Sequence, residues 1–285
     1  MSPILSVDHV GVRFGGLVAI ADLHFDVQPG EIVSLIGPNG AGKTTAFNVM
    51  TGFLKPSQGE VRFRGTSLKG LQPHEITRLG LARTFQRTSV FPDDTVFDNV
   101  MIGLHRQGGR MSRAPLLDAL LGRAGASERA LRERAAALID WVGLSARAQE
   151  RAGALAYGEQ RLVGVALALA TEPAMLLLDE PVSGMNASET RVFVRLIRQI
   201  RERGITVLLV EHDMPMVMEV SDRIVVLNYG RLIAEGPPAA IRSDPAVIEA
   251  YLGQGSAARR AAAEAQGCEA QGCEAQGSVS EAAHA

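Results

Sequence analysis

Gly37-Pro38-Asn39-Gly40-Ala41-Gly42-Lys43-Thr44 is the stretch of this sequence that decides its fold. Its spacing of Gly, four residues, Gly, Lys and then Ser or Thr is typical of loops that bind nucleotide phosphates. An apolar segment, Glu31 to Ile36, precedes it, and a helical pattern from Thr45 to Met50 follows. A strand, a glycine-rich turn and a helix let several backbone N–H groups converge on a polyphosphate. We expect a nucleoside triphosphate site, although the loop alone does not separate an ATPase from a GTPase or a kinase.

Two side chains of this loop have distinct expected roles. Lys43 places a point charge at the β and γ phosphates, and Thr44 offers a hydroxyl to Mg²⁺. Thr45 begins the helical segment and is counted with the nucleotide-binding residues. Chance is a poor explanation, since a chain of this composition would contain the pattern with a probability on the order of 0.003. Only three of the 29 basic residues are lysines: Lys43, Lys55 and Lys69.

Short apolar runs bounded by turn residues recur downstream, at Met175 to Leu178, Thr206 to Val210 and Ile224 to Leu227. Such runs suit strands that are buried on both faces of a parallel sheet. Between them, Glu189 to Glu202 has helical spacing with an apolar stripe formed by Val192, Leu196, Ile197 and Ile200. Strands that alternate with helices predict an α/β fold.

Two other regions differ from this alternation. The first 30 residues and Gly59 to Leu68 alternate polar and apolar residues, which predicts a small antiparallel sheet beside the main one. From about Arg87 to Arg161 strand patterns disappear, and Ala, Leu and Arg dominate. This range, about 87–161, is predicted to be a helical subdomain inserted into the α/β body.

Residues 254–285 form a low-complexity tail after a folded body of residues 1–253. The tail repeats Glu-Ala-Gln-Gly-Cys from Glu264 and again from Glu269, and a five-residue period fits neither a helix nor a strand. With Val279 as its one branched aliphatic residue, the tail is expected to be disordered. Both cysteines, Cys268 and Cys273, lie there, so the body has no thiol for catalysis, a disulfide or a zinc cluster.

Composition excludes several classes of function. The formal net charge of −2 comes from the tail, so the body is neutral and gives no reason to expect a nucleic-acid partner. The longest run of small apolar residues, Leu162 to Ala170, is nine residues long, whereas a membrane span needs about 20. The N-terminus has neither a basic start nor an apolar stretch, so no secretory signal is predicted.

Acidic residues and a histidine follow two of the predicted strands. Asp179 and Glu180 end the Met175 run, where Asp179 would meet Mg²⁺ through water and Glu180 would polarise the attacking water. The alternative is a helix N-cap, because Pro181 follows. His212 follows the Val207–Val210 strand and is expected at the same sheet edge, close to the γ phosphate; the other histidines are read as surface residues. Gln86, in Arg83-Thr84-Phe85-Gln86, could bond a metal-bound or attacking water, or be an ordinary loop residue.

Leu155-Ala156-Tyr157-Gly158-Glu159-Gln160 precedes an apolar helix and is the second predicted anion site. A glycine-containing turn at a helix N-terminus presents backbone donors to an anion. If this turn and the phosphate loop lie at opposite ends of the body, one ATP cannot use both from a single chain. The arrangement therefore favours a dimer that shares nucleotide.

In their order along the chain, these segments resemble the ATP-binding subunits of ABC transporters, over about residues 4 to 253. The resemblance implies a P-loop NTPase fold, with a RecA-like parallel core, an antiparallel β subdomain and an inserted helical subdomain. It makes Leu155 to Gln160 the signature segment that caps ATP held by the opposing subunit. It also implies that Ser183-Gly184-Met185-Asn186 is a dimer-contacting loop, that Phe14 stacks on adenine, and that Thr44, Gln86 and Asp179 serve Mg²⁺.

More narrowly, the chain is similar to the ATPase subunits of bacterial importers for branched-chain or hydrophobic amino acids. The residues that carry this are Arg13-Phe14-Gly15-Gly16-Leu17, Arg83 to Gln86, Leu155 to Gln160, Glu211-His212-Asp213-Met214, Asp244-Pro245 and Tyr251-Leu252-Gly253. Ala156 and Glu159 replace the Ser and Gln usual in the wider family, and Asn186 replaces its dimer-loop acid. With these replacements, the Gly158 backbone and the helix dipole can contribute to holding ATP, and the share of the signature side chains is an open question.

The resemblance implies a peripheral subunit on the cytoplasmic face of the bacterial inner membrane. Its partners would be a second ATP-binding subunit, either a copy or a related chain, two transmembrane permease subunits and, indirectly, a solute-binding protein. A groove beside Gln86 would receive the permease helix, with Val90, Phe91 and Phe97 as candidates to line it or to pack inside the subdomain. The alternatives are an importer of urea, amides or aromatic amino acids, a soluble ABC ATPase of DNA repair or translation, and a regulatory module without turnover.

Overall fold

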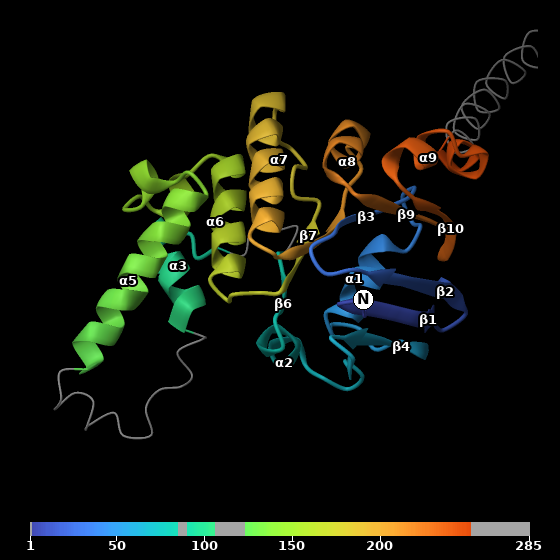
Figure 1. Ribbon diagram of the computed structural model, residues 1–285, viewed down its shortest axis with the longest axis horizontal. Helices are drawn as coiled ribbons and strands as arrows, with labels where there is room; N and C mark the ends of the chain where they lie inside the picture. Colours follow the sequence, from blue (N-terminus) through green and yellow to red (C-terminus); the bar gives the residue numbers. More distant parts are fainter. Residues whose placement is uncertain (1, 85–89, 106–122, 252–285) are drawn as a thin grey trace, which may run out of the picture.

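The computed structural model describes residues 2–84, 90–105 and 123–251 (Figure 1). Gln86 and the tail, with its two cysteines, lie outside these residues. In the described part, ten strands form one sheet in the order β5-β4-β1-β2-β10-β9-β3-β8-β7-β6. The strands are β1 (Leu5–Phe14), β2 (Leu17–Val27), β3 (Ile32–Ile36), β4 (Gln58–Phe63), β5 (Thr66–Ser67), β6 (Leu81–Arg83), β7 (Met175–Asp179), β8 (Thr206–Val210), β9 (Arg223–Asn228) and β10 (Arg231–Gly236).

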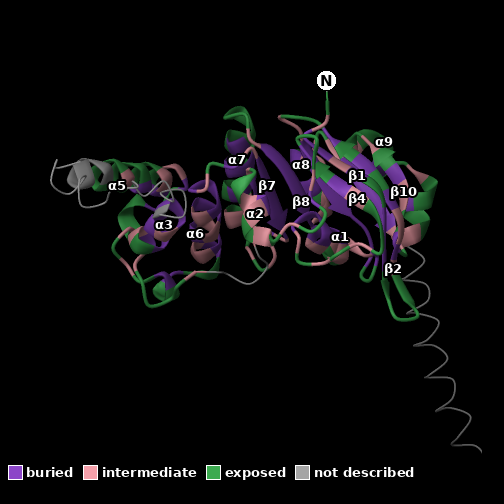
Figure 2. Cartoon of the chain, turned by 90° about the horizontal axis from the view of Figure 1, so that it is seen from below, coloured by how far each residue is buried: buried purple, intermediate pink, exposed green. Residues whose placement is uncertain are grey.

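Strands β9, β3, β8, β7 and β6 pair in parallel and form the centre of the fold. Every residue of β3, β7 and β8 is buried, as their uninterrupted apolar runs predict. Successive side chains of β3 enter different cores, Ile32 and Ile36 on one face and Val33 and Leu35 on the other. The predicted α/β parallel core is confirmed, and Figure 2 shows β7 and β8 coloured as buried.

The predicted small antiparallel sheet is present as β5-β4-β1-β2, but it continues the main sheet instead of lying beside it. The junction is a parallel pairing of β2 with β10 between Asp22 and Arg231. Next to it, the Ala21 N–H donates to the Gly230 carbonyl at 2.8 Å. Strand β2 is 11 residues long, so it can pair with β1 along one edge and still reach β10 on the other.

Helices cover both faces of the sheet. Helix α1 (Lys43–Met50) and α2 (Pro73–Arg78) belong to the core shared with the antiparallel strands. The opposite core receives α3 (Val96–His105), α5 (Arg123–Trp141), α6 (Tyr157–Leu169), α7 (Ala187–Glu202), α8 (Met214–Val220) and α9 (Pro238–Arg242). Short 3₁₀ turns at Ser145–Arg147 and Ala152–Ala154 join α5 to α6. None of the helices described here is long and apolar enough to cross a membrane.

Helices α3, α5 and the start of α6 occupy the range predicted to be a helical subdomain, and they pack on one another at one end of the molecule (Figure 1). In the described part of residues 90–161, the strand-like pairing is a single bridge between Thr95 and Arg151. The boundaries of that subdomain at about 87 and 161 remain a prediction.

One detail of the predicted helix Glu189 to Glu202 is wrong. Helix α7 buries Phe193, Val194, Leu196, Ile197 and Ile200, whereas Val192 is 41% exposed. Val192 lies five positions before Ile197, which is about 140° around the helix at 100° per residue. The buried stripe is therefore centred on Phe193 and Ile197, and Val192 falls at its border.

A pair of glycines tests how tightly the antiparallel strands are packed. Gly59 has φ +73° and Gly65 has φ +76°, but a Cβ at Gly59 would lie 2.2 Å from the His9 carbonyl oxygen, while a Cβ at Gly65 would meet open space. We expect Gly65→Ala to lower the free energy of unfolding by about 1 kcal/mol through backbone strain alone. Gly59→Ala should lower it by about 2 kcal/mol or more, because the backbone of β1 must also move. Urea denaturation of both variants measures the difference, and equal losses would contradict the close packing.

Candidate nucleotide-binding and hydrolysis site

The phosphate loop is held in a conformation that requires glycine at two places. Gly37 has φ +153° and Gly42 has φ +105°. A Cβ at Gly37 would lie 2.1 Å from the Leu227 carbonyl oxygen, and one at Gly42 would lie 2.8 Å from the Ala19 carbonyl oxygen. The loop is thus wedged between β9 and β2. Any other residue at either position would displace the backbone that precedes α1.

Lys43 folds back over this loop. Its Nζ donates to the carbonyl oxygens of Gly37 at 2.7 Å and Pro38 at 3.0 Å. Burial lowers the pKa of Lys43, and the nearby charge of Glu180 partly offsets this. The ammonium group is therefore half-buried beside the loop and within the electrostatic influence of Glu180. Thr44 is exposed in the first turn of α1, whose first N–H groups have no partner within the helix.

The parallel register brings the predicted residues to one edge of the sheet. Leu35 in β3 pairs with Val210 in β8, which in turn pairs with Asp179 in β7. Asp179 is the last residue of β7 and Glu180 follows it, Glu211-His212 follow Val210, and the phosphate loop begins two residues after Leu35. The expectation that they share the carboxyl edge of the sheet is confirmed by this geometry.

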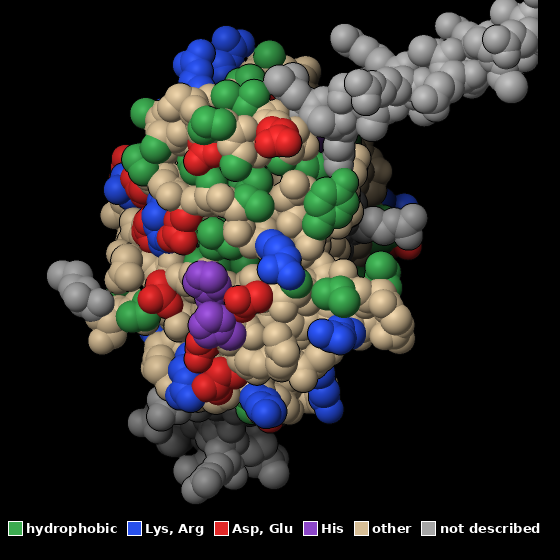
Figure 3. All heavy atoms as spheres, turned by 90° about the vertical axis from the view of Figure 1, so that its right-hand side faces the viewer, with side chains coloured by type: hydrophobic (Ala, Val, Ile, Leu, Met, Phe, Trp, Pro, Cys, Tyr) green, Lys and Arg blue, Asp and Glu red, His purple; other side chains and the backbone are tan. Residues whose placement is uncertain are grey.

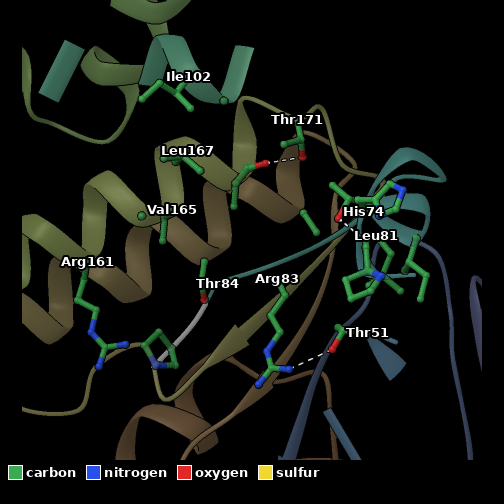
Figure 4. A pocket seen from close by; sticks show the side chains of 18 of the residues that line it. Thr51, His74, Leu81, Arg83, Thr84, Ile102, Arg161, Val165, Leu167 and Thr171 are labelled. Atoms are coloured by element: carbon green, nitrogen blue, oxygen red, sulfur yellow. Dashed lines mark hydrogen bonds between the residues drawn. The ribbon is translucent and has the colours of Figure 1, made fainter. Parts of the chain in front are cut away.

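Asp179 is held by an arginine that sequence analysis did not assign to it. The side chain of Asp179 is 6% exposed, and its Oδ2 accepts a hydrogen bond from the Arg83 guanidinium at 2.7 Å. Another guanidinium nitrogen of Arg83 donates to Asn48 Oδ1 at 2.8 Å and Thr51 Oγ1 at 3.0 Å in and after α1. Figure 4 shows Arg83 directed to Thr51. Arg83 therefore links β6 and β7 to the helix that follows the phosphate loop.

Glu180 adopts a left-handed backbone conformation, with φ +46°. Its N–H donates to the Val210 carbonyl at 2.9 Å, so the chain turns sharply while it still pairs with β8. Non-glycine residues with positive φ are uncommon and concentrate at functional sites. The alternative, a helix N-cap at Asp179 or Glu180, is wrong because the next helix, α7, is capped by Asn186.

A second buried carboxylate, Glu211, organises the loops beside Glu180. It is 1% exposed, and it accepts hydrogen bonds from the N–H groups of Val182 at 2.9 Å and His212 at 3.0 Å. Burial raises the pKa of Glu211, and these amides oppose the shift. His212 itself is exposed, with Nδ1 3.7 Å from Glu211 Oε2. Glu211 fixes the backbone of His212, and the imidazole of His212 lies at the surface of the site.

The signature segment Leu155 to Gln160 leads into α6, with Ala156 as the N-cap and Tyr157 as the first helical residue. Glu159 Oε2 accepts the N–H of Ala156 at 3.1 Å, and its other oxygen lies 3.4 Å from Arg147 Nε. The carboxylate that departs from the wider family is thus bonded to its own helix terminus and paired with an arginine. The Gln160 amide donates to the Leu155 carbonyl at 3.0 Å.

Tyr157 ties this helix start to the acidic strand end. Its hydroxyl accepts from Arg161 Nη2 at 2.6 Å, and Arg161 Nη1 reaches the Asp179 carbonyl at 3.5 Å. A Cβ at Gly184 would lie 3.4 Å from the Tyr157 ring, so the loop Ser183-Gly184-Met185-Asn186 passes beside it. Asn186 caps α7, accepting the N–H groups of Ser188 at 2.9 Å and Glu189 at 3.0 Å. In this chain, the residue that replaces the family's dimer-loop acid therefore serves the helix terminus.

Phe14 and Gln86 are the remaining predicted site residues. Phe14 is the last residue of β1 and is 50% exposed. It lies in the hairpin of β1 and β2, and Ala19 of β2 contacts the phosphate loop. Gln86 lies outside the described residues. Sequence reasoning missed Arg83 and Glu211 as contacts of the site, although both stand in quoted segments at strand ends, which is the signal that could have identified them.

An apolar groove of about 560 Å³ opens next to Arg83 (Figure 4). Ile102 of α3 and Leu167 of α6 lie on one side, and His74 of α2 and Leu81 of β6 lie on the other. Phe91 also lines the groove and is half-exposed, whereas Val90 and Phe97 pack against the helical core. Of the three apolar candidates, Phe91 is the one that lines the groove.

The fold and this edge define a nucleoside triphosphatase with a phosphate-binding loop. The ABC transporter family matches residues 20–183, and a branched-chain amino acid ATP-binding cassette transporter family matches residues 231–257. The high-affinity branched-chain amino acid transport ATP-binding protein of Escherichia coli K12 is 45% identical over 253 residues, covering 88% of this chain and 98% of that protein. The corresponding Pseudomonas aeruginosa protein is 44% identical over the same shares.

Solved structures agree. A nucleotide-free ATP-binding cassette from an ABC transporter has a TM-score of 0.76 at 31% identity, over 88% of this chain and 99% of that one. A dimeric ATP-binding cassette bound to ADP and Pi has a TM-score of 0.69 at 25% identity, over 82% and 98%. The chain belongs to the ABC transporter family, as an ATP-binding subunit that hydrolyses ATP.

The coupling between Lys43 and Glu180 can be measured directly, because the chain has three lysines. We expect the ¹³Cε NMR signal of Lys43, assigned with Lys43→Arg, to titrate below the pH of a lysine in a free peptide. Glu180→Gln should lower this midpoint further, since it removes the charge that offsets burial. The exposed Glu202→Gln is the control. A Lys43 midpoint that does not move in Glu180→Gln would show that the two groups are not coupled.

Proposed function

We propose that this chain is the ATP-hydrolysing subunit that energises import of branched-chain or related hydrophobic amino acids by a membrane ABC transporter. The observation that carries the proposal is the register Leu35–Val210–Asp179, which gathers a phosphate loop and two acids at one edge. The substrate class rests on the likeness to branched-chain amino acid transport proteins over nearly their whole length. That likeness favours this class over urea, amides or aromatic amino acids.

The phosphates of ATP are received by the backbone N–H groups from Asn39 to Thr45 and by Lys43, with Phe14 stacking on adenine. On phosphate binding, Lys43 exchanges its bonds to the loop carbonyls for phosphate oxygens. Glu180 polarises the attacking water, and His212 contacts that water or the γ phosphate. Glu211 and Arg83 act on these groups by positioning the backbone of His212 and the carboxylate of Asp179.

The oxygen donors at this edge fit a magnesium ion. Arg83 bonds Oδ2 of Asp179, so a metal-bound water would use Oδ1, and the exposed Thr44 hydroxyl supplies a direct ligand. Gln86 is the third proposed contact. When bound, Mg²⁺ neutralises charge on the β and γ phosphates.

Two ATP-binding subunits, copies or related chains, close on two ATP molecules. Figures 1 and 2 support this, because both views separate α6, with the signature segment, from α1, with α7 between them along the long axis. Gly158 and the N-terminus of α6 then cap the ATP of the opposing subunit, and the Ser183–Asn186 loop contacts it. Dimerisation is known for a related cassette.

The apolar groove beside Arg83 receives a cytoplasmic helix of one of two permease subunits, with Phe91 in contact. In this proposal the chain lies peripherally on the cytoplasmic face of the bacterial inner membrane and is connected indirectly to a solute-binding protein. ATP closes the two subunits and hydrolysis reopens them, which drives the permease between its inward and outward states. The similarity to transport proteins opposes the first alternative, a soluble ABC ATPase. The presence of Glu180 opposes the second, a regulatory module without turnover.

Substitution of the proposed catalytic carboxylate separates binding from hydrolysis. Glu180→Gln should keep ATP binding and lower the hydrolysis rate about 10²-fold or more, because an amide cannot accept the proton of the attacking water. Nucleotide binding is followed by fluorescence and turnover by phosphate release, with Glu202→Gln as the control. Hydrolysis at the parental rate would remove Glu180 from its role.

The substrate class is tested by uptake in source cells that carry Glu180→Gln in place of the parental chain. Labelled leucine should fail to accumulate, while uptake of an aromatic amino acid and of urea continues. Cells with Glu202→Gln should take up all three compounds. Unchanged leucine uptake with loss of another compound would assign a different substrate to the same family of importer.

A further inference from the structure

Three side chains with metal-binding atoms meet on the outer face of β1 and β2, outside the phosphate loop. They are His9, Asp22 and His24, here called the His9 cluster. His9 Nδ1 lies 2.8 Å from Asp22 Oδ1, and His24 Nδ1 lies 4.0 Å from Asp22 Oδ2. Figure 3 shows histidine side chains side by side on this face of the molecule, with acidic side chains around them.

The backbone is bent to bring His9 into this cluster. Val7 pairs with Phe25 and Val10 pairs with Leu23, so Asp8 and His9 together oppose the single residue His24. This is a β-bulge, a device that redirects a side chain, and His9 takes the left-handed conformation at φ +46°. On the other side, Gly59 leaves room for the His9 carbonyl, where a Cβ would lie 2.2 Å away. A strained bulge supported by a glycine on the next strand is a specific arrangement and not a random surface contact.

The other two ligands need no distortion. Asp22 and His24 are two residues apart on β2 and therefore point to the same face. All three side chains have more than two-fifths of their surface exposed, so an incoming ion need not cross the protein. The three donor atoms lie within 4.8 Å of one another. Bonds of 2.0–2.1 Å in a tetrahedron put ligand atoms about 3.3 Å apart, which is within the 4.8 Å that contains the three donor atoms. His9 Nδ1 and Asp22 Oδ1 now share a hydrogen bond of 2.8 Å, which an incoming ion would replace.

The electrostatic surroundings favour a cation. The two imidazole rings have centroids 5.1 Å apart, which places them on neighbouring sides of the cluster. Asp8, the residue before His9, lines the same shallow hollow of the surface as the two rings. This hollow also contains Asp26 and Glu235, although Arg223 there is paired with Glu31 and Glu235.

We propose that His9, Asp22 and His24 bind a divalent transition-metal ion of the Zn²⁺ class, with solvent in the remaining coordination position. Two imidazoles and one carboxylate suit Zn²⁺, Co²⁺, Ni²⁺ or Cu²⁺, and do not suit Mg²⁺, which prefers oxygen ligands only. The site is separate from the magnesium of ATP hydrolysis and does not depend on the proposed transport function.

Its place in the fold gives the ion a structural effect. Asp22 is the residue through which β2 pairs with β10, and its neighbour Ala21 donates to the Gly230 carbonyl. The Gly230 N–H donates in turn to the Ala41 carbonyl of the phosphate loop at 2.9 Å. An ion bound by residues of both β1 and β2 would stabilise β2, which contacts the phosphate loop. Because the ion would bind the folded state and not the unfolded chain, it would raise the unfolding temperature.

The experiment uses the full chain without a polyhistidine tag and with Cys268→Ser and Cys273→Ser, so that tail thiols cannot bind the probe. Titration calorimetry with Zn²⁺ should show one ion per chain, and Co²⁺ should give the visible absorption bands of tetrahedral nitrogen and oxygen ligation. His9→Asn, which retains a residue tolerant of the left-handed conformation, and His24→Gln should each lower the affinity at least about tenfold. Both should also lose the rise in unfolding temperature with Zn²⁺.

The matched control is His74→Gln, an exposed histidine on α2 outside the cluster, which should bind Zn²⁺ as the parent does. Millimolar Mg²⁺ should not compete. Circular dichroism establishes that the variants are folded. The Co²⁺ spectrum of the parent chain tests metal ligation independently of the variants. Absence of Zn²⁺ binding, or binding that neither His9→Asn nor His24→Gln weakens, would overturn the proposal.

Discussion

The parallel pairing of β3, β8 and β7 is the constraint on which the rest of this structure depends. Because Leu35, Val210 and Asp179 are in register, three chain segments leave the sheet at the same height. One becomes the phosphate loop, one carries Glu180 and one carries His212. A slip of one residue would move every side chain of a strand to the other face and separate these groups. Complete burial of the three strands on both faces prevents such a slip.

Buried charged side chains hold the residues at the ends of these strands in place. Arg83 pairs with Asp179 where both side chains are almost fully buried, and Glu211 accepts backbone N–H groups from two different loops. Removing one partner of such an arrangement leaves an uncompensated charge, which is far more costly than the pair is favourable. These contacts therefore act as positional constraints. They hold the carboxylate of Asp179 and the backbone around His212 before any nucleotide arrives.

The antiparallel strands contribute to the site through their contact with the phosphate loop. Gly42 leaves space for the Ala19 carbonyl of β2, and Gly230 bonds both Ala21 and Ala41. A change that makes β1 and β2 more rigid would therefore also make the phosphate loop more rigid, through these backbone contacts. The bulge at His9 lies in the same pair of strands, so the nucleotide site and the His9 cluster share one support.

The sequence by itself determined the α/β class, the phosphate loop and the two acids at the end of β7, because these depend on local patterns: apolar runs, glycine spacing and the order of residues at strand ends. The resemblance supplied the family, since its motifs are short and contiguous. Tertiary structure alone decided the partners of Asp179 and Glu211, the exposure of Val192, and the continuity of the sheet through Asp22 and Arg231. It also joined His9 to His24, which sequence reasoning had set aside as surface residues. These contacts join residues distant in the chain, and only the register of strands and a bulge bring them together.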